Sequence, residues 1–186
     1  MLCGREYTAY ELLDEIFLDK AYYGAEGGVT FSGGEPLAQP ELLSEVIDLC
    51  KAAGIGCAVE TSMIFYNREI FEKLDLIMAD LKIWDNEVHR QYTGLGNEKI
   101  KENFKRLDEL NIPIIMRTPV IPGIRQEIDK ISMFSKELKN VIQYELLPYH
   151  PLGEAKYRAL GREMKKFEIP SKEYMEELSD YAYICR

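Results

Sequence analysis

Residues Val29 to Leu37 read VTFSGGEPL, and the interpretation of the whole chain starts from this stretch. Its first half is a β-branched and aromatic run that is typical of a buried strand. Its second half exposes the bare backbone of Gly33 and Gly34, which allows close approach, and then presents the carboxylate of Glu35. The stretch therefore predicts a strand that ends either in a ligand site or in a tight turn with a solvated acid.

Strand-like runs alternate with helix-like patterns along all 186 residues. The expected strands span residues 28–32, 55–61, 74–82, 112–120 and 141–148, with Pro113 at the start of its strand, where no ladder donor is needed. The expected helices begin at the capping box of Thr8 and Glu11, at Pro40, at the caps Asn67, Asn97 and Ser171, and at Ile128. This alternation predicts an α/β protein with a parallel sheet and right-handed crossovers, either doubly wound or part of a barrel. We expect one domain over residues 1–186.

Composition excludes several classes of protein. The hydrophobic fraction of 46% and the charged fraction of 30% are those of a globular protein. A net charge of −9 argues against a nucleic-acid binder, and no apolar run is long enough for a membrane span. The N-terminus lacks a signal-peptide pattern, so the expected compartment is the cytoplasm.

The four cysteines, Cys3, Cys50, Cys57 and Cys185, form no CxxC pair and fit no zinc or iron–sulfur spacing. Cys50 and Cys57 occupy apolar positions and are expected to be reduced core thiols. The sequence also has no phosphate loop, no GxGxxG, no HExxH and no GxSxG. Nucleotide-phosphate, zinc-protease and serine-hydrolase chemistry therefore lack their usual motifs.

Polar groups gather at the carboxyl ends of the expected strands, where parallel α/β folds bind ligands. Alone, each has another interpretation: Asp80 and Lys82 could form an ion pair, Arg117 could pair with an acid, and His150 could hydrogen-bond in the core. Together they favour a site for a zwitterionic ligand, with acids for an ammonium and basic side chains for a carboxylate. The groups are Glu35, Glu60, Asp80, Lys82, Arg117 and His150.

The chain resembles a known family, the radical S-adenosylmethionine (SAM) enzymes that activate glycyl radical enzymes. The stretches that carry the resemblance are GGVTFSGGEPL, DLIMADLKIWDNEVHRQYTG, MRTPVIPG and ELLPYHPLGEAKYRALG, in the family's order and over nearly the whole chain. The resemblance implies a partial TIM-like (β/α)6 barrel that holds SAM across its open face.

The resemblance also implies roles for individual residues. Glu35 and the backbone of Gly33 and Gly34 match the positions that bind the methionine amino group. The positions around the methionyl carboxylate, and in some members a monovalent cation, match Glu60, Thr61, Met78, Asp80 and Lys82. The positions near the sulfonium, ribose or adenine match Arg117, Val120 and His150.

In this family a 4Fe-4S cluster reduces SAM, and the 5′-deoxyadenosyl radical takes a hydrogen from a glycine of a large partner. The implied partners are a glycyl radical enzyme of the pyruvate formate-lyase type and a flavodoxin- or ferredoxin-type electron donor, with no nucleic acid and no membrane.

Two departures from the family pattern stand out. The CxxxCxxC motif and the first barrel strand are not in this sequence, and Cys3 alone cannot hold a cluster. ETSM stands where several relatives have DTNG, which puts cation binding at Glu60 in question. We therefore expect a fragment of an activating enzyme, with no metal ligands of its own and no catalytic activity.

Two other functions remain open on the sequence: another radical SAM enzyme, such as an activator of anaerobic ribonucleotide reductase, and a cluster-free SAM-scaffold module that binds proteins. Without the first barrel strand, the strand at 28–32 would have an unpaired edge, which predicts dimerisation or poor solubility.

Overall fold

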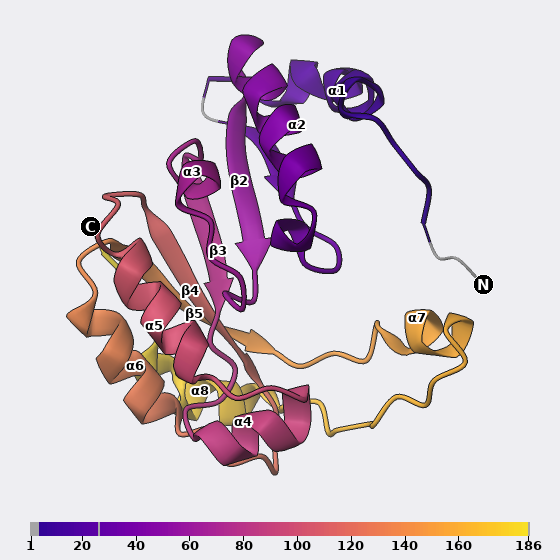
Figure 1. The fold of residues 1–186 in the computed structure, drawn as a ribbon. Coiled ribbons are helices and arrows are strands. Elements are labelled where there is room, and N and C mark those ends of the chain that lie inside the picture. Colours follow the sequence, from indigo (N-terminus) through magenta and orange to yellow (C-terminus); the bar gives the residue numbers. More distant parts are fainter. Residues whose placement is uncertain (1–3, 26, 186) are drawn as a thin grey trace.

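The computed structural model describes residues 4–25 and 27–185. Its centre is one six-stranded sheet in the order β1-β2-β3-β4-β5-β6. The strands are β1 (Gly28–Phe31), β2 (Gly56–Thr61), β3 (Leu76–Asp80), β4 (Ile114–Val120), β5 (Val141–Pro148) and β6 (Tyr183–Ile184). The first five are parallel neighbours, and β6 pairs antiparallel with β5. Parallel strands in chain order, joined by helical crossovers, form the partial TIM-like barrel that was expected (Figure 1).

Helices connect the strands and cover one side of the sheet (Figure 1). The α-helices are α1 (Ala9–Leu18), α2 (Pro40–Ala52), α3 (Arg68–Phe71), α4 (Asn86–Thr93), α5 (Glu98–Leu107), α6 (Ile128–Glu137), α7 (Glu154–Ala159) and α8 (Lys172–Glu177). Three short 3-10 turns are η1 (Lys20–Tyr22), η2 (Pro36–Ala38) and η3 (Ser179–Tyr181).

The sheet has one buried side and one open side, and buried and half-buried residues alternate along its central strands. Along β2, β3 and β4, every second residue is fully buried against the helices, as Val59, Ile77 and Met116 show at 0% exposure. The residues between them are only half-buried. We call this second side the open face. It lacks a helical cover among the described residues, so its side chains are available to a ligand.

The predicted caps hold with one exception. Thr8 and Glu11 form a reciprocal capping box, and Asn67 and Ser171 each accept a hydrogen bond from the backbone three residues on. Asn97 precedes α5 but does not cap it: its Nδ2 donates instead to the carbonyls of Ile83 and Trp84. The predicted N-cap position of Asn97 is confirmed, but its side chain makes no capping hydrogen bond because it bonds the loop after β3.

Three elements were not predicted from residue patterns. Helix α4 was implied only by the resemblance, whereas α7 and β6 were missed. Helix α7 has no buried residue and β6 has two residues, so neither leaves a periodic apolar signal. Among the described residues, no helix is both long and apolar enough to cross a membrane.

Candidate functional site

The open face carries a cluster of charged side chains at the carboxyl ends of the central strands. Strand register places Glu60 beside Met78 and Asp80 beside Arg117, on three neighbouring strands. Residues paired in a parallel ladder project to the same side, so these four side chains meet on the open face. The sequence prediction that the strand ends converge is thus met for these residues.

Arg117 is the centre of this cluster. Its Nη1 lies 2.8 Å from Glu60 Oε1, and its Nε lies 3.3 Å from Asp80 Oδ1. The same Nη1 is 3.8 Å from Met78 Sδ, and the Arg117 side chain is only 14% exposed. Burial lowers the pKa of Arg117, but the hydrogen bond that it donates to Glu60 and the charge of Asp80 raise the pKa above its ordinary value. Arg117 is therefore a fixed cation that orients two acids.

Lys82 is much less constrained. Its Nζ is 3.7 Å from Asp80 Oδ2, beyond ordinary hydrogen-bond distance, and its side chain is 39% exposed. The sequence left open whether Asp80 and Lys82 form an ion pair or contact a ligand, and the structure shows only a long ion pair between them. The ammonium of Lys82 retains its three donors for an incoming carboxylate.

Glu35 ties the end of β1 to the end of β2. Its Oε2 accepts hydrogen bonds from the Ser62 hydroxyl (2.6 Å) and the Ser62 backbone N–H (2.9 Å). Its Oε1 accepts from the Thr61 hydroxyl at 2.8 Å and from the Leu37 N–H at 3.4 Å. Glu35 is therefore bound to protein groups through both oxygens, and its negative charge is held in place at the rim.

The two glycines before Glu35 expose their backbone. Gly33 adopts φ +119°, which side chains with a Cβ rarely tolerate, and no heavy atom lies within 4 Å of the position that a Cβ would take at Gly33 or Gly34. Both residues are exposed. Glu35 fixes the loop, and the loop presents an unobstructed backbone edge to a ligand.

Three of the predicted site residues lie outside the charged cluster. Thr61 and Val120 are buried on the helix side of the sheet, and Thr61 reaches the rim only through its hydroxyl bond to Glu35. His150 follows β5, is exposed and makes no hydrogen bond within the described part of the chain. The sequence alternative that placed His150 in the core is therefore wrong.

Two residues of the site were missed. Glu145 pairs in register with Arg117, so it adds a fourth carboxylate to the rim, and its Oε1 accepts a hydrogen bond from Gln143 at 2.6 Å. Ser62 holds Glu35 through two bonds. The sequence prediction took His150 as the polar group at the end of this strand and so passed over Glu145, which lies three residues before the end of β5. The register of β5 against β4, which shifts between Ile114 and Ile115, brings Glu145 beside Arg117, and the alternation along β5 alone does not give this position.

The charges of the rim favour a cationic ligand. The rim contains the four carboxylates of Glu35, Glu60, Asp80 and Glu145. It contains two cations, Lys82 and Arg117. Beside them, a cavity of about 190 Å³ is lined by Ser62, Asp80, Lys82 and His89 among others. His89 is 3% exposed and its Nδ1 lies 2.6 Å from the Leu95 carbonyl. Burial lowers its pKa, the hydrogen bond with the Leu95 carbonyl raises it, and the positive charges of Lys82 and Lys101 lower it, with a net shift downward.

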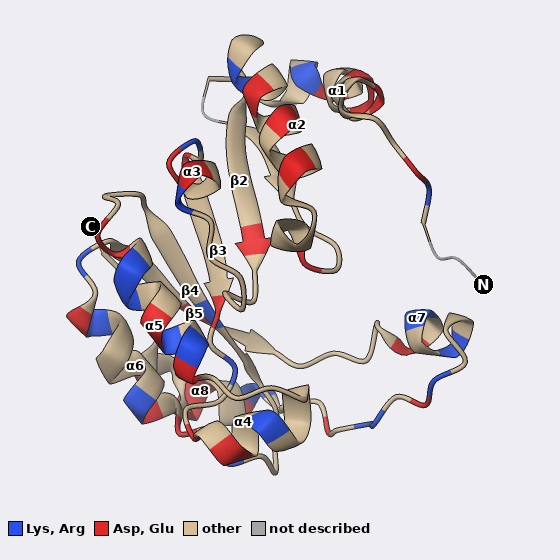
Figure 2. Cartoon of the chain, in the orientation of Figure 1, with Lys and Arg blue, Asp and Glu red and all other residues tan. Residues whose placement is uncertain are grey.

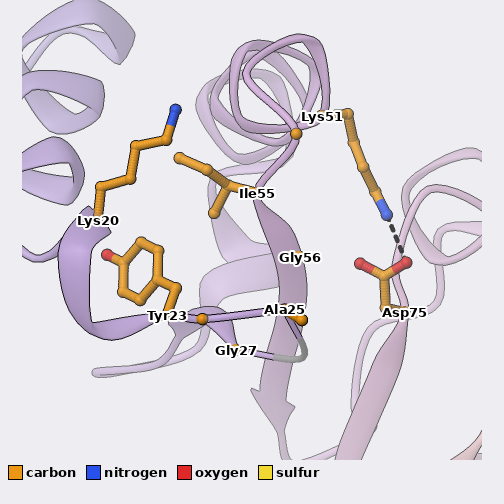
Figure 3. Close-up of a pocket in the computed structure, with 10 residues that line it drawn as sticks. Lys20, Tyr23, Ala25, Gly27, Lys51, Ile55, Gly56 and Asp75 are labelled. Atoms are coloured by element: carbon orange, nitrogen blue, oxygen red, sulfur yellow. Dashed lines mark hydrogen bonds and ion pairs between the residues drawn. The ribbon is translucent and has the colours of Figure 1, made fainter.

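A larger cavity of about 470 Å³ lies at the opposite end of the sheet (Figure 3). It surrounds the start of β2, where Lys51 reaches across to Asp75 at 2.6 Å and Lys20 and Tyr23 form the far wall. The Lys51–Asp75 pair has a structural role, because Asp75 also accepts a hydrogen bond from the backbone N–H of Cys57 at 2.7 Å and so holds the start of β2. Its position at the amino ends of the strands separates it from the charged rim.

The described cysteines do not form a metal site. Cys50 and Cys57 are free and buried, as predicted, and burial raises the pKa of Cys57 to about 12. Cys185 is exposed near β6, and no group of three or more His, Cys, Asp or Glu residues in the described part of the chain could hold a metal ion. Cys3 lies outside the described residues. The described residues therefore do not fit an iron–sulfur cluster.

A parallel half-barrel with a charged rim at its strand ends places the chain in the class of partial TIM-like α/β barrels, which bind ligands at the carboxyl ends of their strands. The family model "Radical SAM superfamily" matches residues 3–132, so the chain belongs to the radical SAM superfamily.

Two curated relatives show where in the superfamily the chain falls. It is 39% identical to the 4-hydroxyphenylacetate decarboxylase activating enzyme of Clostridioides difficile (strain CD196), over 96% of this chain and 60% of the relative. It is 35% identical to the pyruvate formate-lyase-activating enzyme of Clostridium pasteurianum, over 97% of this chain and 79% of the relative. The chain thus spans about 60% of the length of the decarboxylase activating enzymes that it matches.

Solved structures agree with this assignment. A domain of a pyruvate-formate lyase-activating enzyme from Bacteroides vulgatus ATCC 8482 superposes with a TM-score of 0.68 at 30% identity, over 83% of this chain and 91% of that one. Streptococcus suis SuiB bound to its precursor peptide gives a TM-score of 0.74 at 16% identity, over 98% of this chain and 43% of SuiB. The second likeness concerns the fold alone.

Proposed function

We propose that the open face binds S-adenosylmethionine, and that the whole protein activates a glycyl radical enzyme of the pyruvate formate-lyase type. The observation that carries the proposal is the charged rim at the ends of β1 to β5. SAM brings an ammonium, a sulfonium and a carboxylate, for a net charge of about +1, and the rim offers more acids than cations at fixed positions. Membership in the radical SAM superfamily gives this ligand its chemical identity.

Different residues of the rim bind different parts of SAM. The exposed backbone of Gly33 and Gly34 receives the ammonium, with the charge of Glu35 behind it. Lys82 is the free cation and binds the carboxylate, while Arg117 is already bound to two acids and keeps Glu60 and Asp80 in place. Val120 ends β4 and His150 follows β5, so the adenosine would extend toward these two strand ends. The Val120 side chain is buried on the helix side, so only the exposed His150 side chain is available to the adenosine.

The iron–sulfur cluster of the family finds no ligand set among the described residues. We therefore assign binding and orientation of SAM to these residues, and not electron transfer. A flavodoxin- or ferredoxin-type donor and a glycyl radical partner belong to the proposal for the whole protein.

Calorimetry with SAM tests the proposal on this chain. We expect wild-type binding to weaken at least about tenfold, or about 1.4 kcal/mol, in Gly34→Ala, because a methyl group would occupy the exposed backbone edge. We expect a similar loss in Asp80→Asn, which removes one acid from the rim. Lys99→Ala, an exposed change on α5, is the control and should bind like wild type. Absence of wild-type binding, or equal binding by all four proteins, would contradict the assignment.

A further inference from the structure

Residues 151–168 form an arm that leaves the sheet after β5 and returns to α8. No residue of this arm is buried, and α7 stands apart from the sheet on the side that the other helices leave open (Figure 1). A segment that buries none of its side chains gains little from packing, so its sequence is not explained by the core.

The arm nevertheless makes specific contacts, both at its base and within itself. At its base, the ring of Phe167 lies 6.0 Å from that of Tyr92 and 5.6 Å from that of Tyr149. Lys165 Nζ sits 4.7 Å from the centre of the Tyr92 ring. Within the arm, Glu154 pairs with Arg158 at 3.3 Å and with Lys166 at 3.2 Å. These contacts preorganise the arm, which reduces the entropy cost of binding a partner.

The charge of the arm is opposite to that of the rest of the molecule. Its five cations and three acids give +2, so the remaining residues of the chain sum to −11. Figure 2 shows the basic residues along α7 and the returning chain. Lys156 and Arg162 form no ion pair with the described residues, so both are available to an external acid.

The arm and its junction with α8 also expose large apolar side chains. These are Leu152 (78% exposed), Tyr157 (44%), Leu160 (53%) and Ile169 (63%). Exposed apolar side chains among charged ones are available for contact with a partner, and Tyr and Arg are enriched in protein interfaces.

We propose that the arm is the docking surface for the protein substrate, and that it takes a surface segment in which carboxylates flank an apolar side chain. This inference rests on the proposed function, since it names how the partner meets the same open face. The unpaired cations Lys156 and Arg162 complement the carboxylates of a short acidic segment, whereas the −11 of the remaining residues would repel the extended negative charge of a nucleic acid or an anionic lipid surface. A second copy of the chain is the competing occupant.

The test uses the exposed, unpaired cations. The double variant Lys156→Glu/Arg162→Glu is compared with Lys99→Glu/Lys139→Glu, which changes net charge equally on helix-side residues of α5 and at the end of α6. Binding to immobilised pyruvate formate-lyase and to 4-hydroxyphenylacetate decarboxylase is measured by surface plasmon resonance at low and moderate salt. We expect the arm variant to bind at least one of them about tenfold or more weakly than wild type, and the control to bind within about twofold.

Two further measurements separate the possible outcomes. Leu152→Ser/Leu160→Ser removes apolar side chains without changing charge and should also weaken partner binding. SAM calorimetry should be unchanged in both arm variants; failure of the wild type to bind SAM would count against the proposed function and not against the arm. The arm proposal is overturned if wild type binds neither enzyme, if the control loses as much affinity as the arm variant, or if the arm variant alone loses self-association.

Discussion

Arg117 shows how a single residue organises the candidate site. Two carboxylates that approach one another on neighbouring strands repel, and Arg117 bonds one oxygen of each at 2.8 and 3.3 Å. A lysine would not reproduce this arrangement, because the guanidinium holds its N–H donors in one rigid plane, whereas an ammonium is a single point charge on a flexible stem. The geometry leaves Lys82 as the cation that can change partners, since its ammonium is 3.7 Å from Asp80. At the residue scale, the rim thus combines one fixed cation with one free cation.

His89 gives a pH-dependent prediction. Its pKa is lowered by burial, so the unfolded chain, with a value near 6.5, binds a proton before the folded chain does. The neutral ring therefore contributes stability above about pH 7, and this contribution is lost as the pH falls below the unfolded value toward the lower folded one. In His89→Asn, the amide can still donate to the Leu95 carbonyl without titrating. Urea unfolding at about pH 8 and about pH 5.5 should show a larger loss of stability in wild type than in the variant.

The other histidine serves as an internal reference for this measurement. His150 is exposed and is present in both proteins, so its contribution cancels. Parallel losses in wild type and His89→Asn would show that His89 does not control acid stability.

At the scale of elements, the five parallel strands were predictable from the sequence, whereas the short antiparallel strand β6 was not. The predicted strand at 141–148 agrees with β5 at both ends, and the other four are longer than the observed strands by one to four residues. Apolar runs such as those of β3 and β4 mark strands buried on one side, whereas β6 is too short for any pattern. The strand ends located Glu60, Asp80 and Arg117 because parallel strands finish at a common edge. Glu145 needed the register, which no single strand encodes.

The start of β1 gives a prediction at the same scale. Gly28 faces Gly56 in register, and a Cβ at Gly28 would lie 2.1 Å from the Gly56 carbonyl oxygen. Because the obstacle is backbone, the two strands would have to separate. Gly28→Ala should therefore lower the free energy of unfolding by at least about 2 kcal/mol.

Gly34→Ala is the matched control, because no heavy atom lies within 4 Å of its Cβ position and its φ is not in the left-handed region. It should change stability by less than about 1 kcal/mol. Urea denaturation at neutral pH measures both. Equal stability of Gly28→Ala and wild type would show that β1 does not depend on this close approach, and a folded Gly34→Ala protein is what makes its loss of SAM binding interpretable.

At the scale of the whole molecule, the sheet has two unlike edges. On one side, β6 pairs with β5 through Tyr183 and Ile184. On the other, β1 pairs only with β2 within the described part of the chain, and its residues Gly28 and Thr30 are exposed. A mainly apolar cavity of about 360 Å³ lies beside this edge, lined by Leu12, Ile16, Val29, Phe31 and Leu42 among others. An unpaired strand next to apolar surface is a site where another chain can add a strand.

We therefore expect this chain to self-associate through β1 at high concentration, in a two-fold arrangement in which the two β1 strands pair with each other. Thr30→Lys places a charge on the exposed strand, which should oppose this pairing and leave the chain monomeric. Gln91→Lys adds the same charge on the exposed surface of α4 and should still dimerise. Sedimentation equilibrium over a range of concentrations measures the three proteins.

Since β1 and the arm are separate surfaces, Lys156→Glu/Arg162→Glu should dimerise like wild type. A wild-type monomer at every concentration, or a dimer that survives Thr30→Lys, would show that the β1 edge is not the surface of self-association.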